Sequence, residues 1–492
     1  MRCSIFLLVL VCRLSLKAQF LPPGFPQMTI QKSQGESWCD NLFLATVRFV
    51  LPSQLPSTAM ILDRNGDVAW YFQSTENVFD FRPQPGGYLS LFVEPSYYLI
   101  DSTLSFSGQV DCVGKPIDFH ALHVTSDARI FALCTTDSTM DLSGLTTASG
   151  LPGSANGNVV AQTVQELSFN GNLIREWEPW PWFQLGDADS VFFTQPATYD
   201  FTHTNSIDFD GQNLLLSHRS LHALSVIDWN SGALTRHIGG VRSDYGLSVP
   251  AVFKGQHTAR FLDSGRVSLY DNGAQNNPPL SRGLILSLDD STQTGQVHQE
   301  YPNTALVSNS MGSFQVLPDG SALVNHGRFS PIPGPNVEYF AGNGALKASL
   351  TLESTYFTYA AHCGDLPFDL PRPEIRCETR SFDSLLLEVS QPSADYLWST
   401  GATSSSIWVT SPGRYQVFVP SGVGVAGSWA LEIVDVSAGC PIVGVDDPPN
   451  SVASRPKSLG KFDLMGRPTQ AERGRWVLER MSDGSVSKVF VF

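Results

Sequence analysis

The segment from residue 201 to residue 228, FTHTNSIDFDGQNLLLSHRSLHALSVID, concentrates side chains that could act on an anionic group. It contains His203, Asn205, His218, Arg219 and His222, although the chain of 492 residues has only 10 His. Imidazole and guanidinium groups in one place can bind an anion through charge-assisted hydrogen bonds. They can equally cap turns and satisfy buried carbonyl groups. The choice between these interpretations depends on what the other segments supply.

Two other segments repeat one feature of this segment, a His placed just before a strand–turn–strand pattern. They are DFHALHVTSDARIFAL with His120 and GQHTARFLDSGRVSLYDNG with His257. If repeated sheets point equivalent positions at one axis, His120, His203 and His257 converge there together with Arg219. Asn205 lies two residues after His203, on the same face of a strand. We expect the remaining imidazoles to be structural: His218, His222, His237, His298, His326 and His362.

The elements that would position these residues are hairpins. Between about residue 57 and residue 357, runs of alternating hydrophobicity are separated by Asn-Gly, Asp-Gly and Ser-Gly turns, as in MILDRNGDVAWYF and FQVLPDGSALVNHG. This pattern is typical of β-hairpins, and a long series of hairpins predicts a β-propeller or a large sandwich. Six blades would take roughly 55 residues each. The segment 137–200 looks like an insertion or lid, whose Trp180, Trp182 and Phe183 would form either an aromatic wall of a binding site or core packing.

The composition changes at CGDLPFDLPRPEIRC, residues 363–377, which we interpret as a linker. In the segment 371–439 that follows, residues 396–419 alternate apolar and polar side chains across a turn at Pro412–Gly413. It predicts a small β-sandwich that resembles immunoglobulin-like modules. A second linker, DDPPNSVASRPKS, precedes a last piece in which three short strands are expected.

The motifs of the hairpin region resemble those of the arylsulfotransferases that use no nucleotide sulfate donor. The residues that carry the resemblance are HTNSI at 203–207, SHR at 217–219, QHTARFLDSG at 256–265 and DNG at 271–273. It covers residues 36–365 and implies a six-bladed β-propeller with its site on the axis. By resemblance, His257 is the nucleophile, and the supporting residues are His120, His203, Asn205 and Arg219. The first motif departs from the family pattern, so that His123 competes with His120.

The last piece, residues 457–492, closely resembles the type A sorting domain of type IX secretion. The matching positions are Asp463, Leu464, Gly466, Arg467, Gly474, Trp476 and Lys488. The first 18 residues, MRCSIFLLVLVCRLSLKA, have the basic start and short apolar run of a secretory signal peptide. Together they predict a secreted or cell-surface protein with no transmembrane segment in the mature chain and with the type IX machinery as a partner.

Charge and cysteine content narrow the function further. The net charge of −15 argues against nucleic-acid binding. An exported chain meets an oxidising environment that permits disulfides. We expect Cys112–Cys134 and Cys363–Cys377, although spacing does not fix the connectivity. No CxxC pair or carboxylate-rich cluster suggests a metal, so we expect no cofactor.

The implied reaction suits these residue types. An imidazole can attack the sulfur of an aryl sulfate and form a sulfohistidine, which divides the transfer into two steps. Arginine and protonated His residues can stabilise the charge that develops on the sulfuryl oxygens. The expected substrates are a phenolic sulfate donor and a phenol acceptor. Two alternatives remain open: a non-catalytic surface propeller that only binds, and a sulfate-ester hydrolase with water as the acceptor.

Overall fold

The computed structural model describes residues 24–33, 36, 38–47, 56–263, 265–302, 306–329, 334–354, 356–441 and, for the backbone only, 458–462, 475–481 and 486–491. The predicted signal peptide therefore lies outside the described residues. Two compact units are present: Met1–Cys377 with Leu386–Trp408 and Gly413–Leu431, and Glu378–Leu385 with Val409–Pro412 and Glu432–Phe492. No helix among the described residues is long and apolar enough to cross a membrane.

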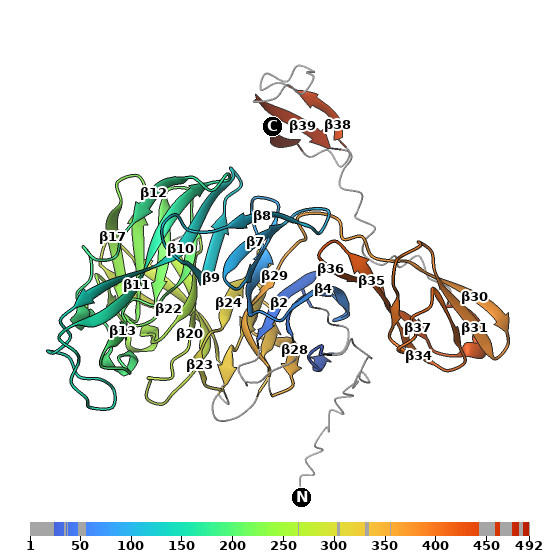
Figure 1. The fold of residues 1–492 in the computed structure, drawn as a ribbon, viewed down its shortest axis with the longest axis horizontal. Coiled ribbons are helices and arrows are strands. Elements are labelled where there is room, and N and C mark those ends of the chain that lie inside the picture. Colours follow the sequence, from blue (N-terminus) through green and yellow to red (C-terminus); the bar gives the residue numbers. More distant parts are fainter. Residues whose placement is uncertain are drawn as a thin grey trace, which may run out of the picture. The chain divides into compact units, whose positions relative to one another are not determined.

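Six antiparallel sheets make up most of the first unit (Figure 1). The first three contain β5 (Val78–Pro83), β6 (Leu89–Val93), β7 (Ser96–Ile100) and β8 (Phe106–Val110); β9 (Ile117–Val124), β10 (Arg129–Met140), β11 (Gly157–Ser168) and β12 (Leu173–Trp177), with β13 (Thr198–Asp200) added to β11; and β14 (Thr204–Phe209), β15 (Asn213–His218), β16 (Ala223–Asp228) and β17 (Ala233–Gly239).

The next three sheets follow the same order of pairing. They contain β19 (His257–Phe261), β20 (Arg266–Asp271), β21 (Arg282–Asp289) and β22 (Thr294–Pro302), with β18 (Gly246–Leu247) added; β24 (Ser313–Val316), β25 (Ala322–Asn325), β27 (Val337–Phe340), β28 (Leu346–Leu352) and β1 (Met28–Lys32); and β29 (Phe357–Cys363), β2 (Asn41–Val47), β3 (Ser57–Asp63) and β4 (Val68–Ser74). A small pair is formed by β23 (Ser308–Ser310) and β26 (Arg328–Phe329). Three short 3₁₀ helices occur at Leu185–Asp187, Ser190–Phe192 and Val249–Ala251.

Turn chemistry explains the hairpins. Between β3 and β4, one carboxylate oxygen of Asp63 accepts hydrogen bonds from the backbone N–H groups of Asn65 and Asp67. Gly66 has a φ of 86°, a conformation that costs glycine little and other residues more. The Asp and Asn-Gly signals of the sequence therefore form the turns that they predicted.

The first strands of the six sheets contact one another in order: β5 with β9, β9 with β14, β14 with β19, β19 with β24, β24 with β29, and β29 with β5. The hydrophobic core lies between consecutive sheets. One cluster, for example, combines Leu215 and Leu224 of the third sheet with Leu269 and Leu284 of the fourth. The predicted all-β class is confirmed; a six-bladed propeller stays a prediction.

Strands of the predicted sandwich extend the last of these sheets. β36 (Gly424–Gly427) pairs with β4 through Val425 opposite Tyr71 and Ala426 opposite Trp70. β35 (Val417–Ser421) and β32 (Leu397–Trp398) continue the same sheet. Arg372 forms a buried ion pair with Asp63 at 2.8 Å. These strands therefore share a sheet and a core with β2–β4. The immunoglobulin-like assignment of residues 371–439 stays a prediction.

The remaining elements of this region are β30 (Ile375–Ser381), β31 (Ser384–Val389), β33 (Ser406–Val409), β34 (Gly413–Tyr415), β37 (Leu431–Ile433) and a 3₁₀ helix at Val436–Ala438. The C-terminal residues form a three-stranded antiparallel sheet of β38 (Ser458–Phe462), β39 (Arg475–Met481) and β40 (Val486–Val491). Of the positions that carry the sorting-domain resemblance, only Trp476 and Lys488 lie on these strands, and the other five fall outside the described residues.

The disulfides confirm one expectation and correct another. Cys112 pairs with Cys134 as predicted. Cys363 does not pair with Cys377; it pairs with Cys39, which is 324 residues away in the sequence. The reason is that β2, which begins two residues after Cys39, lies against β29, which ends at Cys363. Cys377 and Cys440 are each disulfide-bonded.

Candidate active site

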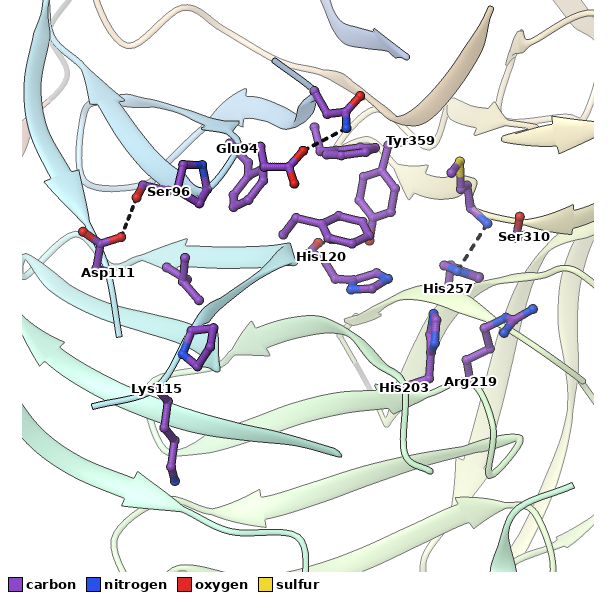
Figure 2. A pocket seen from close by; sticks show the side chains of 18 of the residues that line it. Glu94, Ser96, Asp111, Lys115, His120, His203, Arg219, His257, Ser310 and Tyr359 are labelled. Carbon is purple, nitrogen blue, oxygen red and sulfur yellow. Dashed lines mark hydrogen bonds between the residues drawn. The ribbon is translucent and has the colours of Figure 1, made fainter. Parts of the chain in front are cut away.

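Four of the five predicted site residues line one cavity of about 820 Å³: His120, His203, Arg219 and His257. They come from three sheets. His120 lies within β9, His203 and Arg219 flank the β14–β15 hairpin, and His257 begins β19. Figure 2 shows His203, Arg219 and His257 gathered together, with His120 and Tyr359 nearby. The rings of His120 and His203 are 4.8 Å apart between centroids.

Asn205 is placed differently from the other four. It does not line this cavity; its side-chain amide donates a hydrogen bond to the carbonyl of Gln256 at 2.8 Å. Gln256 in turn donates from its own amide to the carbonyls of His218 and Ala223, both at 3.0 Å. Asn205 therefore holds the residue before His257 instead of reaching into the cavity.

A further contact fixes the same segment. The backbone N–H of Gly255 donates to Nδ1 of His222 at 2.8 Å, while Nε2 of His222 lies 3.0 Å from a carboxylate oxygen of Asp189. Gly255 has a φ of 65°, which favours glycine. His222 was expected to be structural, and it has this role. The path of the chain into His257 is set by the neighbouring sheet.

His257 itself is almost fully buried and is held as a neutral imidazole. Its Nδ1 lies 2.7 Å from Oδ1 of Asn272. The amide nitrogen of Asn272 donates to the carbonyls of Ser308 and Met311 at 3.1 and 2.9 Å, so that its oxygen must face His257. Nδ1 therefore carries the hydrogen, and the lone pair lies on Nε2, which accepts a 3.3 Å hydrogen bond from the backbone N–H of Met311.

The surroundings keep this imidazole unprotonated. Burial lowers the pKa of His257 well below 6.5, and the positive charge of Arg219 lowers it further, as does His203. Asn272 opposes this shift only weakly, because an amide carries no charge. At neutral pH, Nε2 therefore keeps its lone pair and can act as a nucleophile once the long contact from the N–H of Met311 is released.

His120 and His203 differ from His257 because a carboxylate backs each of them. Nδ1 of His120 lies 2.5 Å from Asp118, and Nδ1 of His203 is hydrogen-bonded to Asp200. The pKa of His203 is lowered from 6.5, chiefly by burial, although the charge of Asp200 and its hydrogen bond act in the opposite direction. Both rings can therefore donate a proton from Nε2 when they are charged.

Arg219 supplies a cation with few partners. Its guanidinium lies over the ring of Phe192, 4.2 Å from the centroid, and makes only a long 3.5 Å contact with the carbonyl of Asn309. Its Nε is buried with no hydrogen-bond partner in the described part of the chain. Unsatisfied donors of this kind are costly unless a ligand completes them. An anionic oxygen in the cavity would do so.

Aromatic rings form another part of the cavity wall. The rings are Phe79, Phe92, Phe119 and Tyr359. Phe119 stacks on His120 at 4.0 Å and lies 4.5 Å from Phe79. A phenol ring would therefore meet aromatic faces beside the imidazoles.

The residues expected to form this wall do not line the cavity. Trp180, Trp182 and Phe183 pack with a hydrophobic cluster between the second and third sheets. The core-packing alternative is the one that the structure shows for them.

Several residues of the site were missed by the sequence interpretation. They are Asp118, Asp200, Asn272 and Tyr359. A signal existed for three of them: Asp-Phe precedes both His120 and His203, and Asn272 is the centre of the Asp-Asn-Gly motif. His123, the competitor of His120, lies three residues further along β9 and lines a different cavity. Within the described ranges, no group of three or more His, Cys, Asp or Glu could hold a metal ion.

Comparisons with solved structures give weak likenesses. A protein of unknown function from Bacteroides caccae is 10% identical and covers 66% of this chain and 98% of its own, with a TM-score of 0.41. A catalytically inactive virginiamycin B lyase from Staphylococcus aureus, solved with quinupristin, is 10% identical over 66% of this chain and 99% of its own, with a TM-score of 0.32. These scores carry no argument about fold or function. No curated protein matches the chain.

The sequence model of one family gives a specific match. The family is described as arylsulfotransferase (ASST), and the match covers residues 99–349, just over half of the chain. That range contains His120, His203, Arg219, His257 and Asn272, the residues that meet at or behind the cavity. The chain belongs to the arylsulfotransferase family.

Proposed function

We propose that this protein is an aryl-sulfate sulfotransferase that moves a sulfuryl group from a phenolic sulfate ester to a phenol through a sulfohistidine at His257. One observation carries the proposal above all others. The amide of Asn272 fixes the neutral tautomer of His257 that has its lone pair on Nε2. His257 lines the same cavity as Arg219 and two carboxylate-backed imidazoles. A nucleophile and charge-stabilising donors are thus combined around one space.

The first half-reaction uses each of these groups. Nε2 of His257 attacks sulfur, the bond between sulfur and the aryl oxygen breaks, and the phenolate leaves. A proton passes to that oxygen from Nε2 of protonated His203 or His120. Arg219 stabilises the negative charge on the sulfuryl oxygens. The enzyme is left with an N–S bond at His257 and a neutral His203 or His120.

The second half-reaction reverses these movements. A second phenol binds against Phe79, Phe119 and Tyr359 and loses its proton to the neutral imidazole. Its oxygen attacks sulfur, the N–S bond breaks, and His257 returns to its neutral form. Atoms and protons balance over the cycle, and no metal or other cofactor takes part in it.

We also propose the closed six-bladed propeller. The order of contacts among the first strands, from β5 round to β29 and back to β5, supports it. In such a ring the early parts of the six strands face the axis together, which accounts for a site assembled from distant segments. A crystal structure in which these strands do not form a ring would contradict this part of the proposal.

Export belongs to the proposal as well. The signal-like residues 1–18 and the sorting-like residues 457–492 predict a secreted or surface-attached protein released from the type IX machinery without its tail. Mass spectrometry of the protein collected outside the cells should show a C-terminus before residue 457. An intact C-terminus in the mature protein would contradict the sorting assignment.

The enzymatic test uses p-nitrophenyl sulfate with a series of phenol acceptors. We expect phenol to be released faster when an acceptor is added, with parallel lines in double-reciprocal plots, as for a ping-pong mechanism. His257→Gln should reduce transfer to the uncatalysed background. His298→Gln is the matched control, because His298 contacts Arg266 and Ser287 away from the cavity and should leave activity unchanged.

The same assay separates the alternatives. Release that is independent of the acceptor but abolished by His257→Gln would identify a hydrolase. Binding of aryl sulfates without release, in wild-type protein and for every pairing tested, would leave a binding protein. Full activity in His257→Gln would contradict the sulfohistidine.

A further inference from the structure

A second cavity of about 320 Å³ lies at the opposite ends of the strands that form the first. It is lined by polar side chains that include Arg82, His123, Ser268, Arg260 and His362. None of these residues lines the cavity that contains His257. The proposed sulfuryl transfer makes no use of them.

The first strands of the six sheets, β5, β9, β14, β19, β24 and β29, each contribute to both cavities. On each strand, or just before it as for His203 and Met311, an earlier residue lines the first cavity and a later one lines the second. The pairs, in chain order, are Phe79 and Arg82, His120 and His123, His203 and Asp208, His257 and Arg260, Met311 and Ser313, and Tyr359 and His362. The second cavity is therefore the other mouth of the space that the six strands surround.

The basic groups of this second cavity are incompletely satisfied. Nε of Arg82 lies 3.3 Å from Asp80 but has no hydrogen-bond partner in the described residues. Oγ of Ser268 and Nε2 of His362 are also buried there without a partner, on side chains that are at most 9% exposed. Native proteins rarely leave three such atoms around one cavity unless something else binds them.

Arg260 faces the same cavity with part of its guanidinium engaged. One nitrogen, Nη1, donates to the carbonyls of Ala259 and Ile207 at 2.7 and 3.4 Å. Burial and the charge of Arg82 together lower the pKa of Arg260 to about 10, while the charges of Asp208 and Asp80 act in the opposite direction. Both guanidinium groups line the same cavity, where an anion could bind between them.

The neighbouring acids already have partners. Asp80 accepts a hydrogen bond from the hydroxyl of Tyr97 at 2.9 Å, and Asp208 accepts one from the backbone N–H of Phe261 at 2.8 Å. Burial lowers the pKa of His123 to about 3. The cavity therefore presents two guanidinium groups, two neutral imidazoles and a hydroxyl, with the carboxylates of Asp208 in its wall and of Asp80 beside Arg82.

We propose that this second cavity binds a small tetrahedral oxyanion such as inorganic sulfate or phosphate, held by Arg82, Arg260, Ser268 and His362. Guanidinium groups bind such anions through paired N–H donors. The site differs from the first cavity in size and in lacking the carboxylate-backed imidazoles. It is a binding site, with no reaction assigned to it.

Isothermal titration of the full chain with sodium sulfate tests the proposal, against sodium chloride of equal ionic strength. Wild-type protein should bind sulfate and phosphate. Arg260→Met should weaken sulfate binding by about tenfold or more, since a charge-assisted hydrogen bond is lost. Arg219→Met is the matched control: it removes a guanidinium from the first cavity and should leave this binding unchanged.

Two further measurements decide the remaining cases. Ser268→Ala should weaken sulfate binding a few-fold without disturbing a charge, and it replaces Arg260→Met if that variant does not fold. Sulfate binding that is lost in Arg219→Met but unchanged in Ser268→Ala and Arg260→Met would place the anion in the first cavity and overturn the proposal. Absence of binding to wild-type protein, or equal displacement by chloride, would also overturn it.

Discussion

Two regions of the first cavity contain imidazoles that are backed by different groups. In the region of His120 and His203, Nδ1 faces a carboxylate. In the region of His257, Nδ1 faces the neutral amide of Asn272. All three rings use Nδ1 for support, so that Nε2 is the atom left for chemistry. The partner of Nδ1 influences whether the ring holds a proton or a lone pair: Asp200 acts to raise the pKa of His203, although burial leaves that pKa lowered.

The difference shows how one residue type performs opposite tasks within one cavity. A carboxylate favours the imidazolium form and makes a proton donor. An amide fixes the tautomer without favouring a charge, and makes a nucleophile. Burial lowers the pKa of both His203 and His257. The assignment of roles therefore depends on Asp118, Asp200 and Asn272, which do not themselves need to touch a substrate.

Exchanging the amide for a carboxylate should have the largest effect. Asn272→Asp should raise the pKa of His257, so that the nucleophile becomes protonated as the pH falls through the new value. We expect wild-type transfer to show no loss from His257 protonation between pH 6 and 8, because its pKa is lowered well below 6.5. The variant should lose about 100-fold or more at pH 6 and recover as the pH rises.

The control for this exchange is Asn343→Asp, in an exposed turn where the side-chain oxygen accepts the backbone N–H of Ala345. It adds the same charge outside the cavity and should leave the pH profile unchanged. A profile for Asn272→Asp that is parallel to that of wild-type protein would show that the amide does not govern the protonation of His257.

Removing a carboxylate from the other region should have a smaller effect that depends on the leaving group. Asp200→Asn should lower the pKa of His203 further and weaken it as a proton donor. Transfer from sulfates of weakly acidic phenols should fall by about 10- to 100-fold, and transfer from p-nitrophenyl sulfate should fall less. Steady-state rates for a series of aryl sulfates measure how the rate of transfer depends on the pKa of the departing phenol.

Asp228→Asn serves as the comparison, since Asp228 caps a turn through the backbone N–H of Ser231 and an asparagine oxygen can do the same. An equal loss for every leaving group in Asp200→Asn would mean that His203 does not act on the departing oxygen.

The smallest effect on the protein is expected from removing the hydroxyl of Tyr359, a residue of the aromatic wall of the first cavity. Tyr359 donates to the carbonyl of His120 at 3.0 Å and lies 3.4 Å from the carbonyl of Asn205. Tyr359→Phe keeps the ring and should reduce the free energy of unfolding by about 0.5–1.5 kcal/mol. Chemical denaturation measures this loss. A large fall in kcat with unchanged stability would instead give the hydroxyl a direct role.

The sequence allowed the strand–turn pattern and four cavity residues to be predicted because both depend on local signals. Hairpin turns are encoded by Asp, Asn and Gly within a few residues, and His257 lies in a motif of ten. Tyr359 had no such signal. Its position beside His120 depends on β29 packing against β2 and β5, which are about 300 residues earlier in the sequence. For Trp180, Trp182 and Phe183, the sequence left an aromatic wall and core packing open, because their composition did not reveal that they pack between sheets.

The pairing of Cys39 with Cys363 closes the sheet in which β29 meets β2, and β1 pairs in the same way with β28 in the adjacent sheet. Strands from both ends of the domain thus complete two sheets. During synthesis, β2 can pair with β3 early, but β1 lacks its partner β28 and β2 lacks its second partner β29 until about 300 further residues have emerged, so these two sheets are completed last. The loop closed by the disulfide is long, and such a cross-link restricts the unfolded chain most strongly, by about 5 kcal/mol in the entropic account. The two sheets are therefore incomplete until β28 and β29 have been synthesised. Once they have formed, the Cys39–Cys363 disulfide opposes the separation of β2 from β29.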